Sequence, residues 1–299
     1  MSCLDPILAV SICKNEEDKH VLRFLPSKEI EDIDLKKWVY GSDEVFLLPC
    51  MRCKPCREAY AKDWGVRCTL EAQMHSYNYF VTLTYDDFHV SHGGKSDFTS
   101  FLKKLGYELT GKRDRPKFFA CMEKGEVTHR LHFHCVLFLD KPLTLKSPVK
   151  LGSFYHYSCD LLDDCWGKKG FVDVAEFESD CARYVAKYST KQGRCFMSRN
   201  LAKSYYLKFR DQIVKDDFKV YGSFFGKEYV SIPKCFVRWF VEDHVSVIDS
   251  FKLSQKKIQK LAVLSELHAT GKDDESMLIK EKILTFLKHD QFSKGRSEL

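Results

Sequence analysis

The sequence predicts an α+β fold with a central antiparallel sheet and the ferredoxin-like (RRM-like) βαββαβ order of elements, beginning at residue 79. Three observations predict it. β-branched and aromatic residues gather in short segments bounded by turn residues, as in strands. Between them, apolar residues recur at i, i+3, i+4 and i+7, as in amphipathic helices. The two kinds of segment follow one another in the order strand, helix, strand, strand, helix, strand.

The first strand is Tyr79–Asp87, YFVTLTYDD, which is rich in β-branched and aromatic residues and ends in two acids. The first helix follows in SDFTSFLKKLGYEL, where Ser96 can cap the N-terminus. Its apolar face consists of Phe98, Phe101, Leu102 and Leu105. A basic connection, GKRDRPK, leads to the next strand.

The second and third strands, Lys117–Met122 and Arg130–Leu139, predict a metal site. Alternation in RLHFHCVLFL puts His132 and His134 on one face of the strand. A hairpin would bring Glu123 beside them, and two imidazoles with a third ligand from a neighbouring strand can converge on one ion. The alternative is a half-buried strand whose histidines only satisfy hydrogen bonds.

The second helix is predicted in ESDCARYVAKYSTKQ, capped by Ser179 or Asp180. One face of it carries two phenols and two ammonium groups, from Tyr184, Lys187, Tyr188 and Lys191. The alternative is a tyrosine pair packed on the core with lysines directed outward. Residues 140–173 before this helix are interpreted as an irregular excursion with short strands, and Phe218–Phe225 as the last strand.

A cysteine-rich run precedes this domain. Cys50, Cys53 and Cys56 form two consecutive CxxC spacings, which are typical of metal knuckles, and Cys68 is a candidate fourth ligand of a structural zinc ion. Pro55 can open a helix that continues to about Met74. If that helix is unbroken, Cys56 and Cys68 are about 18 Å apart along it. The better fourth ligands would then be Cys3, Cys13 and His20, and buried thiols without metal are the alternative.

The composition is that of a globular protein and fits a partner with phosphates, although many proteins of this charge bind no nucleic acid. The chain has 299 residues, 44% of them hydrophobic, and a net charge of +6. Thirteen cysteines without a signal peptide predict reduced thiols in a cytoplasm, and no apolar run reaches the roughly 18 residues that cross a bilayer. We expect no membrane association. The residues expected to hold a nucleic-acid backbone are Lys112, Arg113, Arg115 and Lys191.

The predicted organisation has three parts: residues 1–75, a cysteine-rich segment and helix; residues 76–245, the α+β domain; and residues 246–299, a helical region. Metal, tyrosine and lysine together indicate phosphoryl transfer. A tyrosine with a pKa near 10 needs help to attack, which a divalent ion on the phosphate and the Lys187 ammonium can give. The product would be a phosphotyrosine ester, from which a later hydroxyl can reseal the strand.

The motifs YFVTLTYDD, EKGEVTHRLHFH and ARYVAKYSTK, in this order, resemble those of HUH rolling-circle replication initiators, in particular those of microviruses of the gokushovirus type. The resemblance covers residues 1–240 approximately, including the PCxxCxxCR run, WGKKGFVDV and MSRN. It implies an HUH endonuclease that nicks the viral origin, stays attached to the 5′ phosphate and rejoins a circle. His132 and His134 match the metal-binding pair and Glu123 the acidic ligand. The paired nucleophiles match Tyr184 and Tyr188, and the lysine between them matches Lys187.

Two positions depart from the family pattern. Leu131 replaces a proline before the first histidine, and Leu201–Tyr206 replaces a glycine-rich sequence after MSRN. The helices after residue 250 have no clear counterpart.

The resemblance implies Mg²⁺ or Mn²⁺ at the catalytic site, although a His₂Glu set also takes zinc. The expected partners are single-stranded viral DNA at the origin, a host helicase and a host DNA polymerase, in the bacterial cytoplasm. The two tyrosines would alternate, one holding the parental 5′ end while the other cleaves the regenerated origin. The rival interpretation is a non-catalytic, zinc-containing single-strand nucleic-acid binder, which would bind DNA in EDTA and leave no protein–DNA ester.

Overall fold

A computed structural model describes residues 7–16, 20–24, 45–112, 114–125, 130–152, 154–178, 181, 184–185, 194–221 and 229–243. The chain divides into two compact units. One is Glu58–Asp243, and the other combines Met1–Arg57 with His244–Leu299. The predicted C-terminal helical region, residues 246–299, lies outside the described residues.

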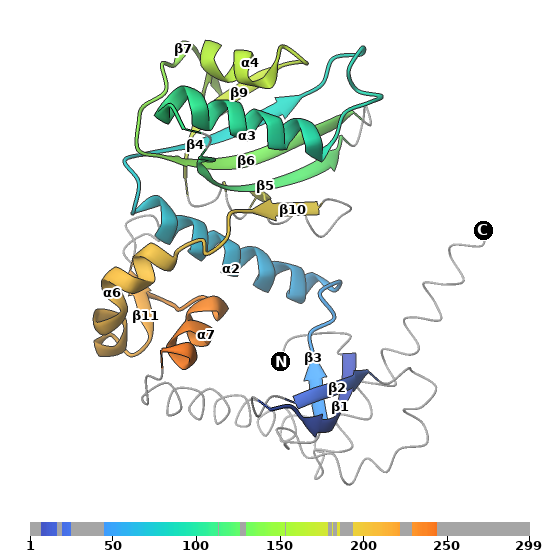
Figure 1. Ribbon diagram of the computed structural model, residues 1–299, viewed down its shortest axis with the longest axis vertical. Helices are drawn as coiled ribbons and strands as arrows, with labels where there is room; N and C mark the ends of the chain where they lie inside the picture. The colour runs from blue at the N-terminus through green and yellow to red at the C-terminus, as the bar shows by residue number, and fades with distance from the viewer. Residues whose placement is uncertain are drawn as a thin grey trace, which may run out of the picture. The chain divides into compact units, whose positions relative to one another are not determined.

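The larger unit is built on a seven-stranded sheet in which every neighbouring pair is antiparallel. The strands, in spatial order, are β10 (Arg194–Met197), β5 (Lys117–Lys124), β6 (Leu131–Leu139), β4 (Tyr77–Thr84), β9 (Val172–Glu176), β8 (Phe154–Ser158) and β7 (Lys146–Leu151). The predicted α+β class with a central antiparallel sheet is confirmed (Figure 1).

The ferredoxin-like order is present as β4, α3 (Lys95–Thr110), β5, β6, α4 (Asp160–Trp166) and β9. The last two elements are not the predicted ones. α4 lies within residues 140–173, the segment interpreted as an irregular excursion with short strands, and β9 begins at the end of that segment. Both elements are too short, at 7 and 5 residues, to show a clear period. The strand predicted over Phe218–Phe225 was wrongly assigned to the main sheet. Its described part, β11 (Lys219–Tyr221), pairs instead with β12 (Tyr229–Ser231) in a separate two-stranded sheet.

One face of the sheet is covered by α3 and α4 (Figure 1). The odd-numbered residues of β6 point to this side, so Phe133 packs between the two helices. Its ring lies 5.0 Å from that of Phe98 and 6.0 Å from that of Trp166. This layer buries the largest core cluster of the described residues and fixes the position of β6 in the middle of the sheet.

The opposite face is partly covered by α2 (Lys54–Ala72), whose Trp64 ring stacks on Phe119 of β5 at 4.7 Å. Val136 and Phe138 of β6 belong to the same cluster. Since strand residues alternate in direction, His132 and His134 share the face of Val136 and Phe138. The histidines therefore lie on the face that α2 covers only in part.

Two further helices, α6 (Lys203–Lys215) and α7 (Lys234–Glu242), complete this unit. Tyr206 of α6 packs its ring on Phe236, Trp239 and Phe240 of α7. In the other unit, β2 (His20–Phe24), β1 (Ile7–Lys14) and β3 (Val45–Leu48) form a three-stranded antiparallel sheet. No helix in the described part of the chain is both long enough and apolar enough to cross a membrane.

Candidate metal centre and tyrosine site

Three predicted metal ligands meet on β5 and β6. The strand register places Glu123 directly across from His132. Glu123 Oε1 lies 3.3 Å from His132 Nε2 and 3.0 Å from His134 Nε2. The side chains of Glu123, His132 and His134 are 13, 18 and 11% exposed. They therefore form a largely buried site. The hairpin thus brings two imidazole nitrogens onto one carboxylate oxygen.

These separations fit a shared cation. Ligands about 2.1 Å from an octahedral ion lie about 3.0 Å apart, and those about 2.0 Å from a tetrahedral zinc ion lie about 3.3 Å apart. The donor set of two imidazoles and one carboxylate suits Mg²⁺ less than Mn²⁺ or Zn²⁺ by ligand type, but accommodates each by geometry. Burial, together with the nearby His134, lowers the pKa of His132, which favours the neutral form that can bind a metal.

Thr82 is a member of the site that sequence reasoning missed. It lies directly across from His134, on β4, and its Oγ1 is 3.1 Å from His134 Nδ1. If Nε2 of His134 faces a cation, Nδ1 carries the proton and donates to the Thr82 hydroxyl, which orients the ring. A signal was present in YFVTLTYDD, where Thr82 and Thr84 alternate as the histidines do. It could be interpreted only once β4 was known to pair with β6.

Tyr184 lies beside this group. Its ring is 5.6 Å from the His134 ring and 6.1 Å from that of Phe80, edge-on to both. The side chain is 42% exposed, while the next residue, Val185, is buried among α2, β5 and β6. Val185 therefore anchors the segment on the histidine face of the sheet, and Tyr184 stays accessible. Tyr188, Lys187 and Lys191 lie outside the described residues.

Comparison with known proteins finds a family model and several relatives that match the chain. Residues 78–193 match the model of a family of replication-associated proteins of the ORF2 type. Over 290 residues, 87% of each chain, the sequence is 27% identical to Replication-associated protein ORF2 of Spiroplasma virus 4. The chain is similar to viral replication-associated proteins. The resemblance inferred from the motifs is confirmed, and the matched range contains Glu123, His132, His134 and Tyr184.

Two phage proteins are similar over shorter ranges. Replication-associated protein VP4 of Bdellovibrio phage phiMH2K is 32% identical over 170 residues, 52% of this chain and 53% of that protein. Replication-associated protein ORF4 of Chlamydia phage 1 is 32% identical over 157 residues, 49% of this chain and 39% of that protein. No solved structure matches the chain.

The structure does not place the predicted basic nucleic-acid contacts next to Glu123, His132 and His134. Lys112 and Arg115 precede Lys117, the first residue of β5, whereas Glu123 lies near the last. These two ends of β5 are about 20 Å apart at the rise of a β-strand. Arg113 lies outside the described residues.

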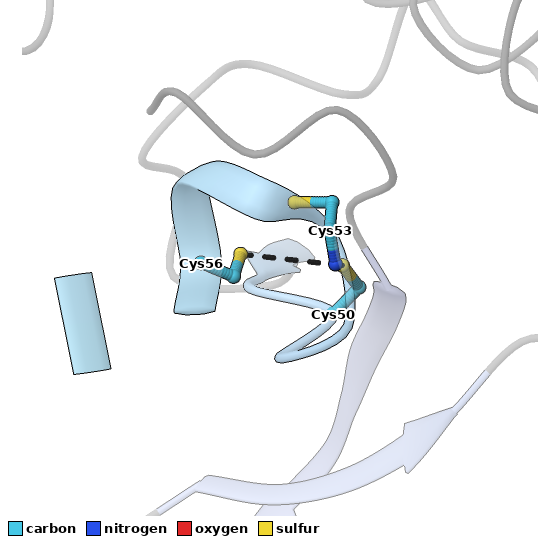
Figure 2. Close-up of side chains that lie close together, drawn as sticks. All are labelled: Cys50, Cys53 and Cys56. Carbon is cyan, nitrogen blue, oxygen red and sulfur yellow. Dashed lines mark hydrogen bonds between the residues drawn. The ribbon is translucent and has the colours of Figure 1, made fainter. Parts of the chain in front are cut away.

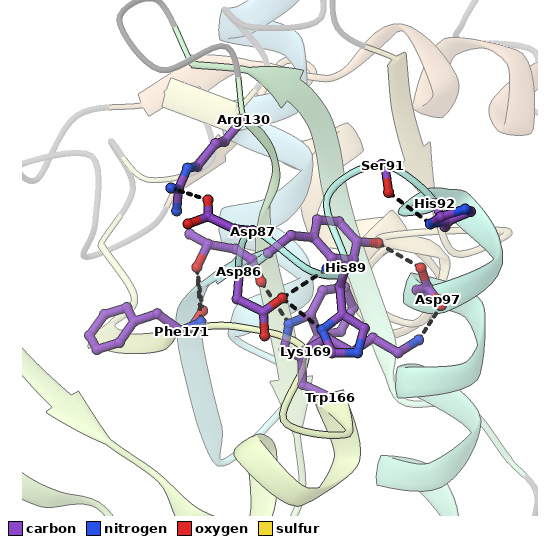
Figure 3. A network of polar contacts seen from close by, with 12 residues as sticks. Asp86, Asp87, His89, Ser91, His92, Asp97, Arg130, Trp166, Lys169 and Phe171 are labelled. Carbon is purple, nitrogen blue, oxygen red and sulfur yellow. Dashed lines mark hydrogen bonds and ion pairs between the residues drawn. The ribbon is translucent and has the colours of Figure 1, made fainter.

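A network of polar contacts fixes the loop after β4, beside the point where β6 begins (Figure 3). Asp86 accepts from the His89 backbone and ring at 2.8 and 2.7 Å, and Asp87 pairs with Arg130. The indole of Trp166 donates to the Thr84 carbonyl at 2.8 Å. Thr84 lies directly across from His132. These bonds therefore hold the end of β4 that pairs with the start of β6, where His132 lies.

A pair of polar side chains, Asp173 and His156, also lies on the histidine face. The sequence did not predict this pair. Asp173 of β9 lies directly across from Thr82, in the same transverse row as His134. Its Oδ2 is 2.7 Å from Nδ1 of His156 on β8, whose side chain is 25% exposed. The polar surface around the metal group therefore extends across four strands, β5, β6, β4 and β9, and onto β8.

Proposed function

We propose that this chain initiates phage replication by nicking single-stranded viral DNA at the origin through a tyrosine, with Tyr184 as a nucleophile. One observation carries the proposal. A partly exposed phenol lies 5.6 Å, ring to ring, from an imidazole whose Nε2 converges with a second imidazole on one carboxylate oxygen. The names of the relatives support a role in replication, and phosphoryl transfer is what such a constellation can perform.

The cleavage step joins Tyr184 Oη to the scissile phosphorus and breaks the bond between that phosphorus and the 3′ oxygen. The phenol proton passes to water, and the departing 3′ oxygen takes a proton from water, so the overall charge is unchanged. Glu123, His132 and His134 would hold a divalent cation, Mg²⁺ or Mn²⁺, which would neutralise charge on the non-bridging oxygens. Thr82 would keep the His134 ring in the orientation for this task.

Joining is the reverse displacement. The phosphotyrosine ester retains the free energy of the phosphodiester, so a 3′ hydroxyl can attack the phosphorus and release the tyrosine without a nucleotide cofactor. We propose that Tyr184 and Tyr188 alternate in successive rounds, with Lys187 balancing the charge of the phosphate. In the sequence the tyrosines are four residues apart, which on a helix places two side chains on one face.

A covalent-adduct assay tests this function. The full chain is incubated with Mn²⁺ and labelled single-stranded oligonucleotides tiled across the phage genome that encodes it, and products are separated on a denaturing gel. We expect a protein–DNA adduct with one oligonucleotide, and no adduct in EDTA, in His132→Ala or in the Tyr184→Phe/Tyr188→Phe double variant. Peptide mapping of the adduct should find DNA on Tyr184 or Tyr188.

The matched control is Tyr107→Phe, which removes an exposed phenol from α3, on the other side of the sheet, and should leave the adduct yield unchanged. An adduct that persists in the double variant would overturn the assignment of the nucleophiles. DNA binding that is insensitive to EDTA, with no adduct under any condition, would instead establish the non-catalytic binder. A nickase role also implies a host helicase and DNA polymerase as partners in the bacterial cytoplasm.

A further inference from the structure

A second group of ligand atoms lies outside the tyrosine site, in the smaller unit. The Sγ atoms of Cys50, Cys53 and Cys56 all lie within 4.8 Å of one another, and those of Cys50 and Cys56 are 4.0 Å apart (Figure 2). Cys50 and Cys56 are buried, at 4 and 6% exposure. Sulfur ligands of a tetrahedral zinc ion, at about 2.3 Å from the metal, lie about 3.8 Å from each other. The three thiols are therefore already near the spacing that one zinc ion requires.

The backbone is folded around one of these sulfurs. The N–H groups of Arg52 and Cys53 both donate to Cys50 Sγ, at 3.4 and 3.2 Å. To allow this, Met51 adopts a φ of 60°, a left-handed conformation that is uncommon for a residue with a side chain. Two N–H donors aimed at one sulfur stabilise a thiolate far more than a thiol. The turn is thus shaped for a negatively charged ligand sulfur.

The helix that follows also favours negative charge at this place. α2 begins at Lys54, inside the cysteine run, and its first turn contains no acidic residue. The positive end of the helix dipole therefore has no carboxylate partner in that turn, and thiolates of Cys53 and Cys56 would supply the missing charge. Soft thiolates of this kind select zinc over the hard cations that suit a carboxylate site.

We propose that Cys50, Cys53 and Cys56 bind one structural zinc ion as thiolates, separate from the cation of the tyrosine site. Ile7 of β1 packs against the same cluster. The ion would therefore fasten the start of α2 to the first strand of the small sheet. Binding releases the three thiol protons to solvent and involves no change of oxidation state.

The structure reduces the number of residues that could be the fourth ligand of this zinc ion. Cys68 does not join the cluster, because α2 is continuous from Lys54 to Ala72 and Cys68 follows Cys56 by about 18 Å along it. Cys68 is instead fully buried in the core against β5. Cys13 lies at the other end of β1 from Ile7, about 20 Å away.

His20 pairs with Lys14 at that same far end of β1. Cys3 lies outside the described residues. The proposal therefore rests on three protein thiolates.

Metal analysis of the purified full chain tests the site. To remove the competing histidine ligands, the measurement uses His132→Ala/His134→Ala as the parent, so that its outcome does not depend on nicking activity. We expect about one zinc ion per chain in the parent and a loss of at least about tenfold in zinc content in Cys53→Ser. Cys53 is the half-buried member of the cluster, so its substitution disturbs packing least.

The matched controls are Cys13→Ser, an exposed cysteine of the same unit, and Cys68→Ala, a buried cysteine of the same helix; both should keep the zinc. A second measurement avoids variants altogether. Co²⁺ added to the metal-free parent should give sulfur-to-cobalt charge-transfer absorption, which Cys53→Ser loses. A parent without bound zinc or without this absorption would overturn the proposal, as would Cys53→Ser with the zinc content of the controls.

Discussion

One side chain that contacts a candidate metal ligand is itself not a ligand. Thr82 reaches His134 Nδ1 from the neighbouring strand, and Phe80 stacks on the same ring at 5.8 Å. The ring is thus held by a hydrogen bond at one nitrogen and by an aromatic face. Partners of this kind set the tautomer and orientation of a metal-binding histidine. Thr82 is a positioning residue, and its effect should be on metal affinity.

Thr82→Val keeps the shape of the side chain and removes the hydroxyl. We expect the Mn²⁺ concentration that gives half-maximal adduct to rise by about 10-fold to 100-fold, because the imidazole loses the partner that orients it. The adduct yield at saturating Mn²⁺ should fall much less. A Mn²⁺ titration of the adduct assay measures both quantities.

Thr84→Val is the control for that titration. Thr84 lies on the same face of β4, but its hydroxyl accepts from the Phe171 N–H and donates to the Phe171 carbonyl, both at 3.0 Å. Its loss should lower stability by about 1 kcal/mol and leave the Mn²⁺ requirement near that of the wild type. Equal shifts in the two variants would mean that Thr82 acts through the strand and not through the imidazole.

Among the elements, α3 depends on one close approach. An ideal Cβ on Gly106 would lie 1.8 Å from the carbonyl oxygen of Asp114, in the segment that connects α3 to β5. This neighbour is backbone, which cannot move aside as a flexible side chain can. The helix and the connection can pack together only because residue 106 has no side chain.

Gly106→Ala should therefore destabilise the chain by about 1–3 kcal/mol, the usual range for overpacking, although alanine is the better helix former. Urea unfolding followed by circular dichroism measures the change. Gly94→Ala is the comparison, because no atom lies within 4 Å of a Cβ there, and it should cost clearly less. Equal losses at the two positions would show that the close approach to Asp114 is not the cause.

The elements that sequence analysis predicted are those with a strong period. β6 alternates His132 and His134 against Phe133 and Cys135, so its faces could be assigned before its neighbours were known. α3 shows its apolar face in the same way, and the four predicted residues are all buried. The sequence also predicts a hairpin that brings Glu123 beside the histidines, and in the structure Glu123 lies directly across from His132.

Elements decided by long-range packing could not be predicted. α4 and β9 are short, and their positions depend on Trp166 and Val172, which pack into the same core cluster as the apolar face of α3. Thr82 and Asp173 became part of the site only through the pairing of β4 with strands that are distant in sequence. Lys112 and Arg115 remain predicted nucleic-acid contacts, and they lie before the start of β5, at the end opposite Glu123.

At the scale of the whole larger unit, one ionic cluster ties three segments together. Glu71, on the last turn of α2, is 1% exposed and accepts a hydrogen bond from the backbone N–H of Ala202, just before α6. His75 Nε2 lies 3.1 Å from Glu71 Oε1, and its Nδ1 lies 2.9 Å from Asp140 Oδ1 at the end of β6. Ionised carboxylates only accept, so both contacts are hydrogen bonds when His75 is protonated on both ring nitrogens.

The pKa values of this cluster set the direction of its effect on stability. Burial acts to lower the pKa of His75, but the hydrogen bonds to Glu71 and Asp140 outweigh it and raise the pKa above the ordinary 6.5. Burial likewise acts against the Glu71 carboxylate, yet the bonds from His75 and Ala202 lower its pKa below the ordinary 4.5. The His75 contribution is therefore full below about pH 6.5 and is lost as pH rises through the raised value. The Glu71 contribution is present above about pH 4.5 and is lost as pH falls through the lowered value.

His75→Gln should consequently cost most stability between about pH 4.5 and 6.5, where both groups are charged in the native protein. We expect a loss of about 1 kcal/mol near pH 6, a figure discounted because Asp140 is 77% exposed. The loss should be smaller near pH 9, because the contribution of the charged imidazole falls as pH rises through its raised pKa. Urea unfolding of the two proteins at both pH values measures the difference. His92→Gln is the control, since His92 is an exposed histidine outside this cluster that bonds only Ser91 among the described contacts, and its loss should cost little stability. A loss for His75→Gln that is equal at both pH values, or larger at pH 9, would mean that the three segments are held by packing and not by the charged imidazole.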